Sequence, residues 1–424
     1  MVFLISWLAA RRKVVIAVVL TGLSAGLGGI ALTWVLHLTQ HLAFGYVEES
    51  FLPGVEQASP AHRIAALVVG GLLVGLGWWA LERWARSEDV SVKAALAGDT
   101  PRLRVRASVF DAVLQVVGVG AGASLGREGA PRQVGAALAG WLGERLDMDE
   151  GTRRTLMAAG AGAGLAAVYN VPISGVIFTL EVLLASWAWR NVLLAAATSL
   201  IATVITWPIL GTHSAYDVQG LHLDLSVLVW VLLAGPVLGA GGVVFTALMR
   251  VARGRIPSGR ARVVTTVGAF LLLGGLAAFY PQVLGNGKGP TQVAFTGSVS
   301  LMLAIVLVVL KPVATALCLA GGARGGLLTP SLSTGALLGV ATGVIWQHLW
   351  PGAPVVDFAV IGAASMLAVT QRAPVLGTVL TLEFIGGGLT LLPALLICVM
   401  LATLTARALD GRSPRVAGIS GLRV

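Results

Sequence analysis

Long runs of hydrophobic residues recur along the whole chain, separated by short polar or basic stretches. Six runs are long enough to cross a bilayer, which needs about 20 helical residues. They cover residues 14–36, 64–81, 225–249, 263–280, 301–319 and 389–409. The rest of the chain is also largely apolar and leaves no segment for a soluble domain. The pattern therefore predicts a polytopic α-helical membrane protein.

The amino-acid composition supports this prediction and narrows it. Hydrophobic residues make up 56% and charged residues 11% of the 424 residues, a balance that excludes a soluble globular domain. The 55 glycines are far more than usual. In membrane helices, small residues allow close packing and also permit helix breaks beside a cavity. This composition favours a channel or transporter over a simple membrane anchor.

Most of the net charge of +10 lies in basic clusters next to the hydrophobic runs. The clusters are Arg11-Arg12-Lys13, Arg102/Arg104/Arg106, Arg153-Arg154, Arg250/Arg253/Arg255/Arg260/Arg262 and Arg407/Arg412/Arg415. Such clusters are typical of cytoplasmic loops, so we expect no nucleic-acid partner. We also expect no cofactor and no metal site, because His37 and His41 have no third ligand nearby. Cys318 and Cys398 lie inside hydrophobic runs and indicate buried apolar positions.

Two pairs of similar segments indicate an internal duplication. Residues 170–181 and 372–383 share a proline, a glycine and a final Thr-Leu-Glu in the same order. Residues 126–131 and 325–330 each place a proline five residues after a glycine. We expect repeat halves at about 60–215 and 225–410. Interrupted hydrophobic segments at matching places in two halves are typical of the substrate site of a transporter.

The segment Gly126-Arg127-Glu128-Gly129-Ala130-Pro131 carries two ionisable residues inside an apolar, glycine-rich region. An ionisable side chain at membrane depth costs about 2.5–3.5 kcal/mol and by default marks a functional site. The glycines let backbone N–H groups point at a ligand, and the proline suits the first turn of a helix. The segment predicts a broken helix that faces an anion, with Glu128 competing for the same place. An Arg–Glu pair at a membrane surface is the alternative.

Together these motifs resemble the CLC family of chloride channels and chloride/proton antiporters, in its bacterial form without cytoplasmic regulatory domains. The resemblance implies an all-α polytopic fold of two inverted halves, built from tilted and broken helices. It also implies a homodimer in the inner (plasma) membrane, with one anion pore in each subunit. Glu128 would be the gating glutamate. The residues implied in anion binding are Gly126, Arg127, Gly129, Ala130, Gly326, Leu327, Leu328, Thr329 and, as the weakest match, Ser87.

The sequence departs from the family pattern at three places. Ala130 displaces the proline of the first motif by one residue, and Val182 stands where proton-coupled members carry a second glutamate. No tyrosine lies near residues 414–416, where the family places its inner tyrosine. We therefore predict transport of small inorganic anions, most simply chloride, that is weakly coupled or uncoupled to protons. The alternative is a proton-coupled chloride or fluoride antiporter of the same family.

The remaining expectations concern organisation and a rival function. We expect a short interfacial helix at residues 1–13, a transmembrane domain at 14–410 and a short tail at 411–424. An intramembrane enzyme that uses Glu128, Glu181 and Glu383 as acid and base is the remote alternative. The last two glutamates end apolar helices at equivalent places of the repeat. We expect them to cap helices or bond between helices, and Arg127 to hold its loop through a neighbouring carboxylate or carbonyl.

Overall fold

The computed structural model describes residues 2–45, 51–86, 90–98 and 102–411, with the backbone alone for residues 2–11. This part of the chain is helical, and its single β-bridge joins Gly126 to Gly326. Ser87 and residues 414–416 lie outside the described residues. The structure therefore does not test the expected role of Ser87 in anion binding or the region where the family places its inner tyrosine.

Eight helical segments are long and apolar enough to cross a membrane. They belong to α1 (Val2–Phe44), α3 (Pro60–Leu81), α9 (Trp189–Leu210), α10 (Leu225–Arg253), α11 (Arg260–Phe279), α13 (Leu301–Ala320), α14 (Leu328–Gln347) and α17 (Leu392–Asp410). Each of the six predicted runs overlaps one of these segments and extends at most three residues beyond its ends. The sequence pattern missed α9 and α14. Pro208 interrupts the pattern of α9, and α14 is rich in small polar residues because most of it is buried inside the protein.

The other helices are shorter or less hydrophobic. They are α2 (Phe51–Gln57), α4 (Val92–Ala97), α5 (Val105–Gly120), α6 (Gly129–Arg145), α7 (Glu150–Tyr169), α8 (Pro172–Ile177), α12 (Lys288–Phe295), α15 (Val355–Gln371) and α16 (Pro374–Phe384). Helix α8 continues as a π-helical turn (Phe178–Leu184), and two short 3-10 turns (Pro281–Val283 and Leu389–Leu391) precede α12 and α17.

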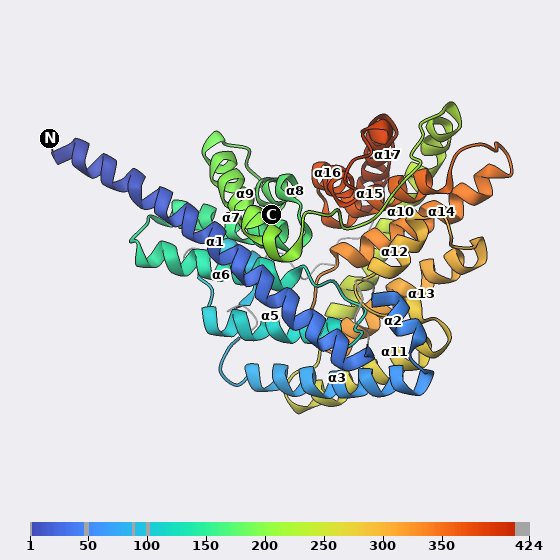
Figure 1. Cartoon of the computed structure of the whole chain (residues 1–424), viewed down its shortest axis with the longest axis horizontal. Coiled ribbons are helices and arrows are strands. Elements are labelled where there is room, and N and C mark those ends of the chain that lie inside the picture. Colours follow the sequence, from blue (N-terminus) through green and yellow to red (C-terminus); the bar gives the residue numbers. More distant parts are fainter. Residues whose placement is uncertain (1, 46–50, 87–89, 99–101, 412–424) are drawn as a thin grey trace.

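Helix α1 corrects the expected separate helix at residues 1–13. It runs without a break from Val2 to Phe44, and Figure 1 shows it as one long rod whose N-terminal end projects from the molecule. The first glycine of this helix is Gly22, and no proline interrupts it. Arginine and lysine are good helix formers. The basic triplet at residues 11–13 therefore does not end the helix.

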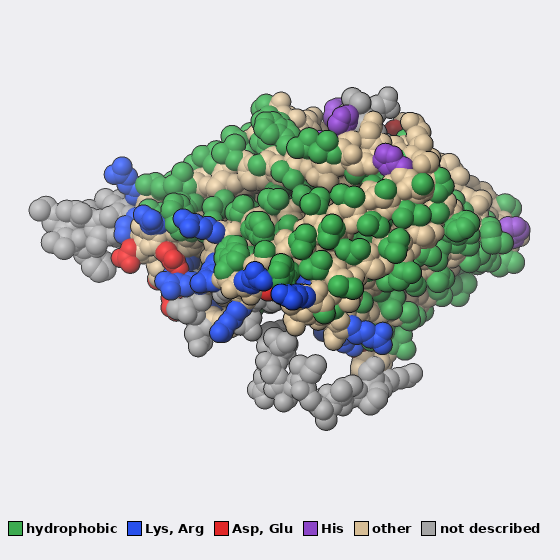
Figure 2. All heavy atoms as spheres, turned by 90° about the horizontal axis from the view of Figure 1, so that it is seen from below, with side chains coloured by type: hydrophobic (Ala, Val, Ile, Leu, Met, Phe, Trp, Pro, Cys, Tyr) green, Lys and Arg blue, Asp and Glu red, His purple; other side chains and the backbone are tan. Residues whose placement is uncertain are grey.

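Many of the exposed basic residues gather on one side of the molecule. Figure 2 shows Lys and Arg side chains gathered along one edge, beside a broad hydrophobic surface. Hydrogen bonds tie the helix ends of this side together. Arg102 Nε donates to Glu144 at 2.6 Å near the end of α6, and Arg104 Nη1 donates to the Trp84 carbonyl at 2.7 Å beyond α3. By the positive-inside bias, this is the cytoplasmic side.

The two halves enter the protein from opposite sides. Helix α5 starts on the basic side, as the contact of Arg104 shows, and helix α6 ends on the same side, as the contact of Arg102 with Glu144 shows. At the other end of the repeat, Trp346 Nε1 donates to Ser226 Oγ at 2.9 Å. This bond places the end of α14 beside the start of α10, whose far end carries Arg253. The halves are therefore inverted.

The inverted halves exchange helix caps. The Glu383 carboxylate accepts hydrogen bonds from the backbone N–H groups of Ile173 (3.0 Å) and Ser174 (2.7 Å) at the start of α8. In return, the Glu181 carboxylate accepts two from the start of α16, at 3.1 and 2.7 Å. Carboxylates satisfy the otherwise unpaired N–H groups of a helix start. These contacts confirm the expected capping role of both glutamates.

Candidate functional site

The two interrupted segments meet at the centre of the molecule. Gly126 N donates to the Gly326 carbonyl at 2.8 Å, and Gly326 N donates to the Gly126 carbonyl at 2.7 Å. Each segment reaches this bridge after a helix, α5 or α13, that is followed two residues past its end by an equivalent glycine, Gly122 or Gly322, with φ of 110° and 102°. Only glycine adopts this backbone conformation readily. These glycines turn both chains out of their helices and towards each other.

Glu128 lies fully buried beside the bridge. Its Oε1 accepts a hydrogen bond from Leu328 N at 2.7 Å, and its Oε2 accepts one from Thr329 Oγ1 at 3.1 Å. Leu328 is the first residue of α14, and a helix N-terminus carries about +0.5 charge. The carboxylate thus occupies a place that suits a small anion. Its two oxygens stand in for that anion in the geometry.

The other predicted anion-binding residues surround this carboxylate. Leu327 precedes α14, and Gly129 and Ala130 open α6 directly after Glu128. All of them therefore lie at the two helix starts that meet at the bridge. Their role in anion binding stays a prediction, as does that of Gly126 and Gly326, whose N–H groups bond to each other's carbonyl oxygens.

Arg127 departs from its expected contact. Its guanidinium lies over the Tyr169 ring, 5.0 Å from the ring centroid, and its buried Nε has no hydrogen-bond partner among the described residues. A cation over an aromatic face is stabilised by the ring quadrupole. The loop is held by this stacking in place of the expected carboxylate or carbonyl contact.

Two cavities reach the site. An outer cavity of about 390 Å³ is lined by Arg127, and an inner cavity of about 730 Å³ is lined by Gly129. The two neighbours of Glu128 thus belong to different cavities. The inner cavity also borders Arg253, at the end of α10 on the basic side. Glu128 therefore separates an inner from an outer approach.

Sequence reasoning missed a buried polar network beside the inner cavity. Asp111 Oδ1 accepts hydrogen bonds from Trp78 Nε1 and Arg324 Nη1, both at 3.0 Å. Asp111 Oδ2 accepts one from Gln115 Nε2 at 2.8 Å. The signal was available, because Asp111 is an ionisable residue inside an apolar segment. The network fixes α5 against the second repeat through Arg324.

Arg132 and Lys311 are two further residues that the motifs did not mark. Arg132 Nε donates to the Glu128 carbonyl at 2.7 Å. Lys311, fully buried in α13, donates through Nζ to Ser124 Oγ (2.9 Å) and to the carbonyl oxygens of Val283 (2.9 Å) and Gly285 (2.8 Å). Buried charges in membrane helices are normally paired in this way. Lys311 thereby anchors the loop that leads to the bridge.

Inverted halves, broken helices and a buried carboxylate at the crossing of two helix starts define a membrane transport protein of the inverted-repeat class. Residues 70–407 match the family model described as Voltage gated chloride channel. The chain therefore belongs to this family, the CLC family, and is a multi-pass protein of the bacterial inner membrane.

Its curated relatives include H(+)/Cl(-) exchange transporters. The chain is 32% identical to ClcA of Cronobacter sakazakii over 428 residues, covering 93% of this chain and 86% of the relative. It is 29% identical to ClcA of Vibrio parahaemolyticus over 365 residues, covering 82% and 78%.

Solved structures share the fold. A slow cyanobacterial Cl-/H+ antiporter superposes with a TM-score of 0.82 at 22% identity, covering 94% of this chain and 95% of that one. A CLC-type fluoride/proton antiporter gives 0.75 at 21% identity, covering 94% and 96%. At these identities the likeness establishes the all-α inverted-repeat architecture.

Proposed function

We propose that this protein exchanges chloride for protons across the inner membrane. The observation that carries the proposal is the fully buried Glu128 carboxylate, hydrogen-bonded at the start of α14 where an anion fits. The relatives named as H(+)/Cl(-) exchange transporters support it. Val182 and the lack of an inner tyrosine led us to expect weak or no coupling. The comparisons favour the coupled alternative.

The chemistry follows from competition at one place. An ionised Glu128 accepts the hydrogen bonds of Leu328 N and Thr329 Oγ1 and blocks the site. Protonation removes the negative charge, which weakens both contacts and the attraction to the helix start. A chloride ion then takes over the same donors. Each return of Glu128 to the site releases its proton and expels the anion, which links the two movements.

Protons need a route to Glu128 that does not use Val182. The inner cavity is lined by Gly129, the residue next to Glu128, and by the polar side chains of Gln115 and Gln133. A polar cavity of this size holds water, and water chains conduct protons. In our proposal the inner cavity supplies protons, while the outer cavity beside Arg127 receives them.

The substitution Glu128→Gln tests the proposal. Purified protein in liposomes is given a chloride gradient, and proton and chloride movement are followed together. Wild type should drive protons uphill, whereas E128Q should move chloride without protons and without pH dependence. Glu150→Gln is the control, because Glu150 is an exposed acid at the start of α7. Proton pumping by E128Q would refute the gating role, and none by wild type would refute coupling.

Fluoride is the second candidate ion. Thr329 Oγ1 places a side-chain hydroxyl at the site, and one structural relative is a fluoride/proton antiporter. A strong donor favours the small fluoride ion more than chloride. Equal concentrations of the two ions in the same liposome assay separate the candidates. Faster fluoride flux would replace chloride as the proposed substrate.

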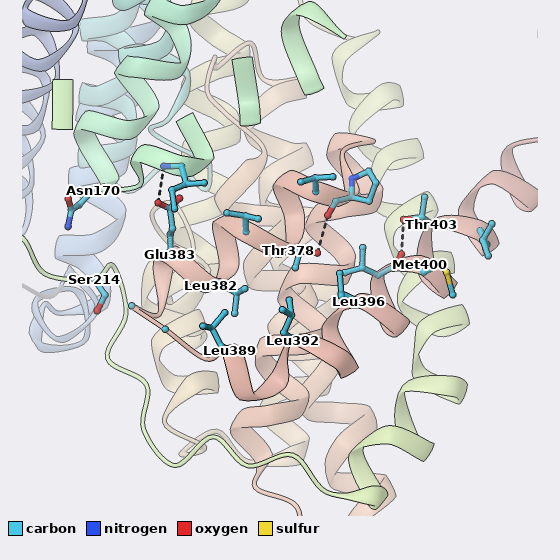
Figure 3. A pocket seen from close by; sticks show the side chains of 18 of the residues that line it. Asn170, Ser214, Thr378, Leu382, Glu383, Leu389, Leu392, Leu396, Met400 and Thr403 are labelled. Atoms are coloured by element: carbon cyan, nitrogen blue, oxygen red, sulfur yellow. Dashed lines mark hydrogen bonds between the residues drawn. The ribbon is translucent and has the colours of Figure 1, made fainter. Parts of the chain in front are cut away.

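We also propose that the protein is a homodimer. A groove of about 1090 Å³ runs between α8 and α17, and Figure 3 shows Glu383, Thr378 and Thr403 among its apolar lining. Leu389 and Met400 in this groove are 71% and 55% exposed. A carboxylate facing lipid is costly, so cover by a second copy is favoured. The proposed dimer would be refuted if the protein had the mass of a monomer in detergent and gave no cross-linked dimer in bilayers.

The remote enzyme alternative loses its candidate acid and base. The carboxylate oxygens of both Glu181 and Glu383 accept hydrogen bonds from backbone N–H groups at helix starts of the opposite half. In the proposed function they are therefore structural groups, and Glu128 is the residue proposed to carry the proton.

A further inference from the structure

The inner cavity carries an excess of positive charge. Five cationic side chains and two carboxylates line it, namely Lys93, Arg132, Arg253, Arg262, Arg324, Glu82 and Asp111. Arg262 is paired with Glu82 at 2.5 Å, and Arg324 with Asp111 at 3.0 Å. Among the described residues, this leaves Lys93, Arg132 and Arg253 without an anionic partner.

Arg132 is the innermost of these three cations. Its Nε donates to the Glu128 carbonyl at 2.7 Å, and its guanidinium lies 5.0 Å from the centroid of the Phe178 ring. These two contacts fix the plane of the guanidinium. In the part of the chain that the structure describes, its two Nη groups have no hydrogen-bond acceptor, and the residue lines the cavity. Such a fork suits two oxygens of one ligand.

Lys93 and Arg253 come from elements far apart in sequence, α4 and the end of α10, yet they face the same space. Their mutual influence shows in the titration of Lys93. Removal from solvent at the cavity wall lowers the pKa of Lys93, and the charges of Arg132, Arg253 and Arg372 lower it further. Positive charges that repel each other in a cavity are stabilised when an anion joins them.

We infer that the inner cavity is a second anion site, separate from the place held by Glu128, and that its ligand is a multiply charged oxyanion of the phosphate type. Three unpaired cations favour a polyvalent anion over chloride. The Arg132 fork matches the oxygen spacing of a phosphate. The cavity, at about 730 Å³, falls within the usual range for small-molecule sites. It admits inorganic phosphate or the phosphates of a nucleotide.

The bound oxyanion would inhibit transport from the basic side. Beyond the cavity, the backbones of Gly126 and Gly326 are hydrogen-bonded directly to each other. A phosphate group therefore stops at Arg132, beside the entry to the Glu128 site. There it excludes chloride and water from the inner approach. This effect on flux rests on the proposed function, whereas binding itself does not.

Binding and inhibition are measured separately. Calorimetry with the purified full chain in detergent uses inorganic phosphate in one arm and ATP in the other, in chloride-free buffer. Chloride flux from liposomes is then measured with the same two compounds. Binding of either compound supports the site. Similar affinity for phosphate and ATP would show that a free oxyanion is enough for binding. Much tighter binding of ATP would show that the ligand is a larger molecule that carries phosphates.

Four variants test the assignment. Lys93→Gln and Arg253→Gln should each weaken phosphate binding roughly fivefold, since each removes one of three facing charges. Arg132→Gln should weaken it about tenfold or more, because charge-assisted hydrogen bonds are also lost, and Arg132→Lys should restore part of that loss. Arg255→Gln removes the same charge from the same helix end but does not line the cavity. It should bind as wild type does.

Two results would overturn the inference. One is phosphate and ATP binding that is undetectable in wild type, and the other is an equal loss in R255Q and in the cavity variants. If R132Q alone fails to fold, K93Q and R253Q still test the inference, because both leave the contact between Arg132 and the Glu128 carbonyl intact. Phosphate binding without any chloride flux in wild type would refute the proposed function and keep this site.

Discussion

The exchange of caps between the halves makes a sharp prediction about Glu383. Its carboxylate accepts three hydrogen bonds at the start of α8, from Ile173 N (3.0 Å), Ser174 N (2.7 Å) and Ser174 Oγ (2.5 Å). Glu383→Gln keeps the shape of the side chain but replaces one acceptor oxygen with an NH₂ donor. One N–H group at the helix start then faces another donor and loses its partner.

The cost can be worked from these contacts. Hydrogen bonds to a charged group contribute about 1.5–3 kcal/mol, and the charge at a helix start adds about 0.3–1 kcal/mol. Because the amide oxygen keeps one contact, we expect E383Q to lower the free energy of unfolding by about 2 kcal/mol. Glu181, its counterpart in the other half, accepts only two such bonds, so Glu181→Gln should lower the free energy of unfolding by somewhat less.

Unfolding by sodium dodecyl sulfate titration measures the free-energy change, and liposome fluxes measure the ratio of protons to chloride. Both variants should be less stable and should keep the wild-type ratio. If E181Q or E383Q loses proton movement at unchanged stability, the glutamate is part of the proton path and the capping argument fails. The control is E150Q, whose carboxylate lies at an exposed helix start.

Three further predictions concern single contacts. Thr329→Val removes a hydroxyl donor that, in the proposed function, serves Glu128 and the anion alike, and it should lower the ratio of fluoride to chloride flux a few-fold, since about 1 kcal/mol of hydrogen bonding is lost. Lys311→Met leaves two buried carbonyl groups unpaired and should cost about 3 kcal/mol in detergent unfolding. Hydrogen bonds from Thr152 hold the pKa of Asp149 below its ordinary value, so its stabilisation is present at neutral pH and lost as pH falls through the folded pKa. Asp149→Ala should cost about 1 kcal/mol at pH 7 and little in strong acid.

Much of the fold could be predicted because hydrophobic length and repeated motifs are local signals. The six long runs, the paired helix breaks and the two capping glutamates each depend on a short stretch of sequence. The site was predictable for the same reason, since Glu128 stands alone among glycines. The hydrophobic pattern did not predict helix α14, because a helix surrounded by protein needs no hydrophobic surface towards lipid. Its glycine and hydroxyl residues lower its hydrophobicity.

The inner side of the site could not be predicted from motifs. Asp111 and Arg324 are 213 residues apart, and only the folded chain shows that they neutralise each other. The same holds for Glu82 and Arg262, which lie in different helices. Counting charges along the sequence gives a basic loop. Counting them after pairing gives, among the described residues, three cations that face one cavity.

In the proposed function, this pairing also bears on how protons reach Glu128 without a second glutamate at Val182. Two carboxylates line the inner cavity. Glu82 is paired with Arg262, and Asp111 accepts three hydrogen bonds from Trp78, Gln115 and Arg324. Among the residues that the structure describes, both carboxylates of the cavity are therefore already engaged by cationic partners. The cavity's excess positive charge lowers the proton concentration at its mouth and raises that of chloride. Exchange that starts from this side should then be limited by proton arrival, and it should speed up when salt screens the three cations.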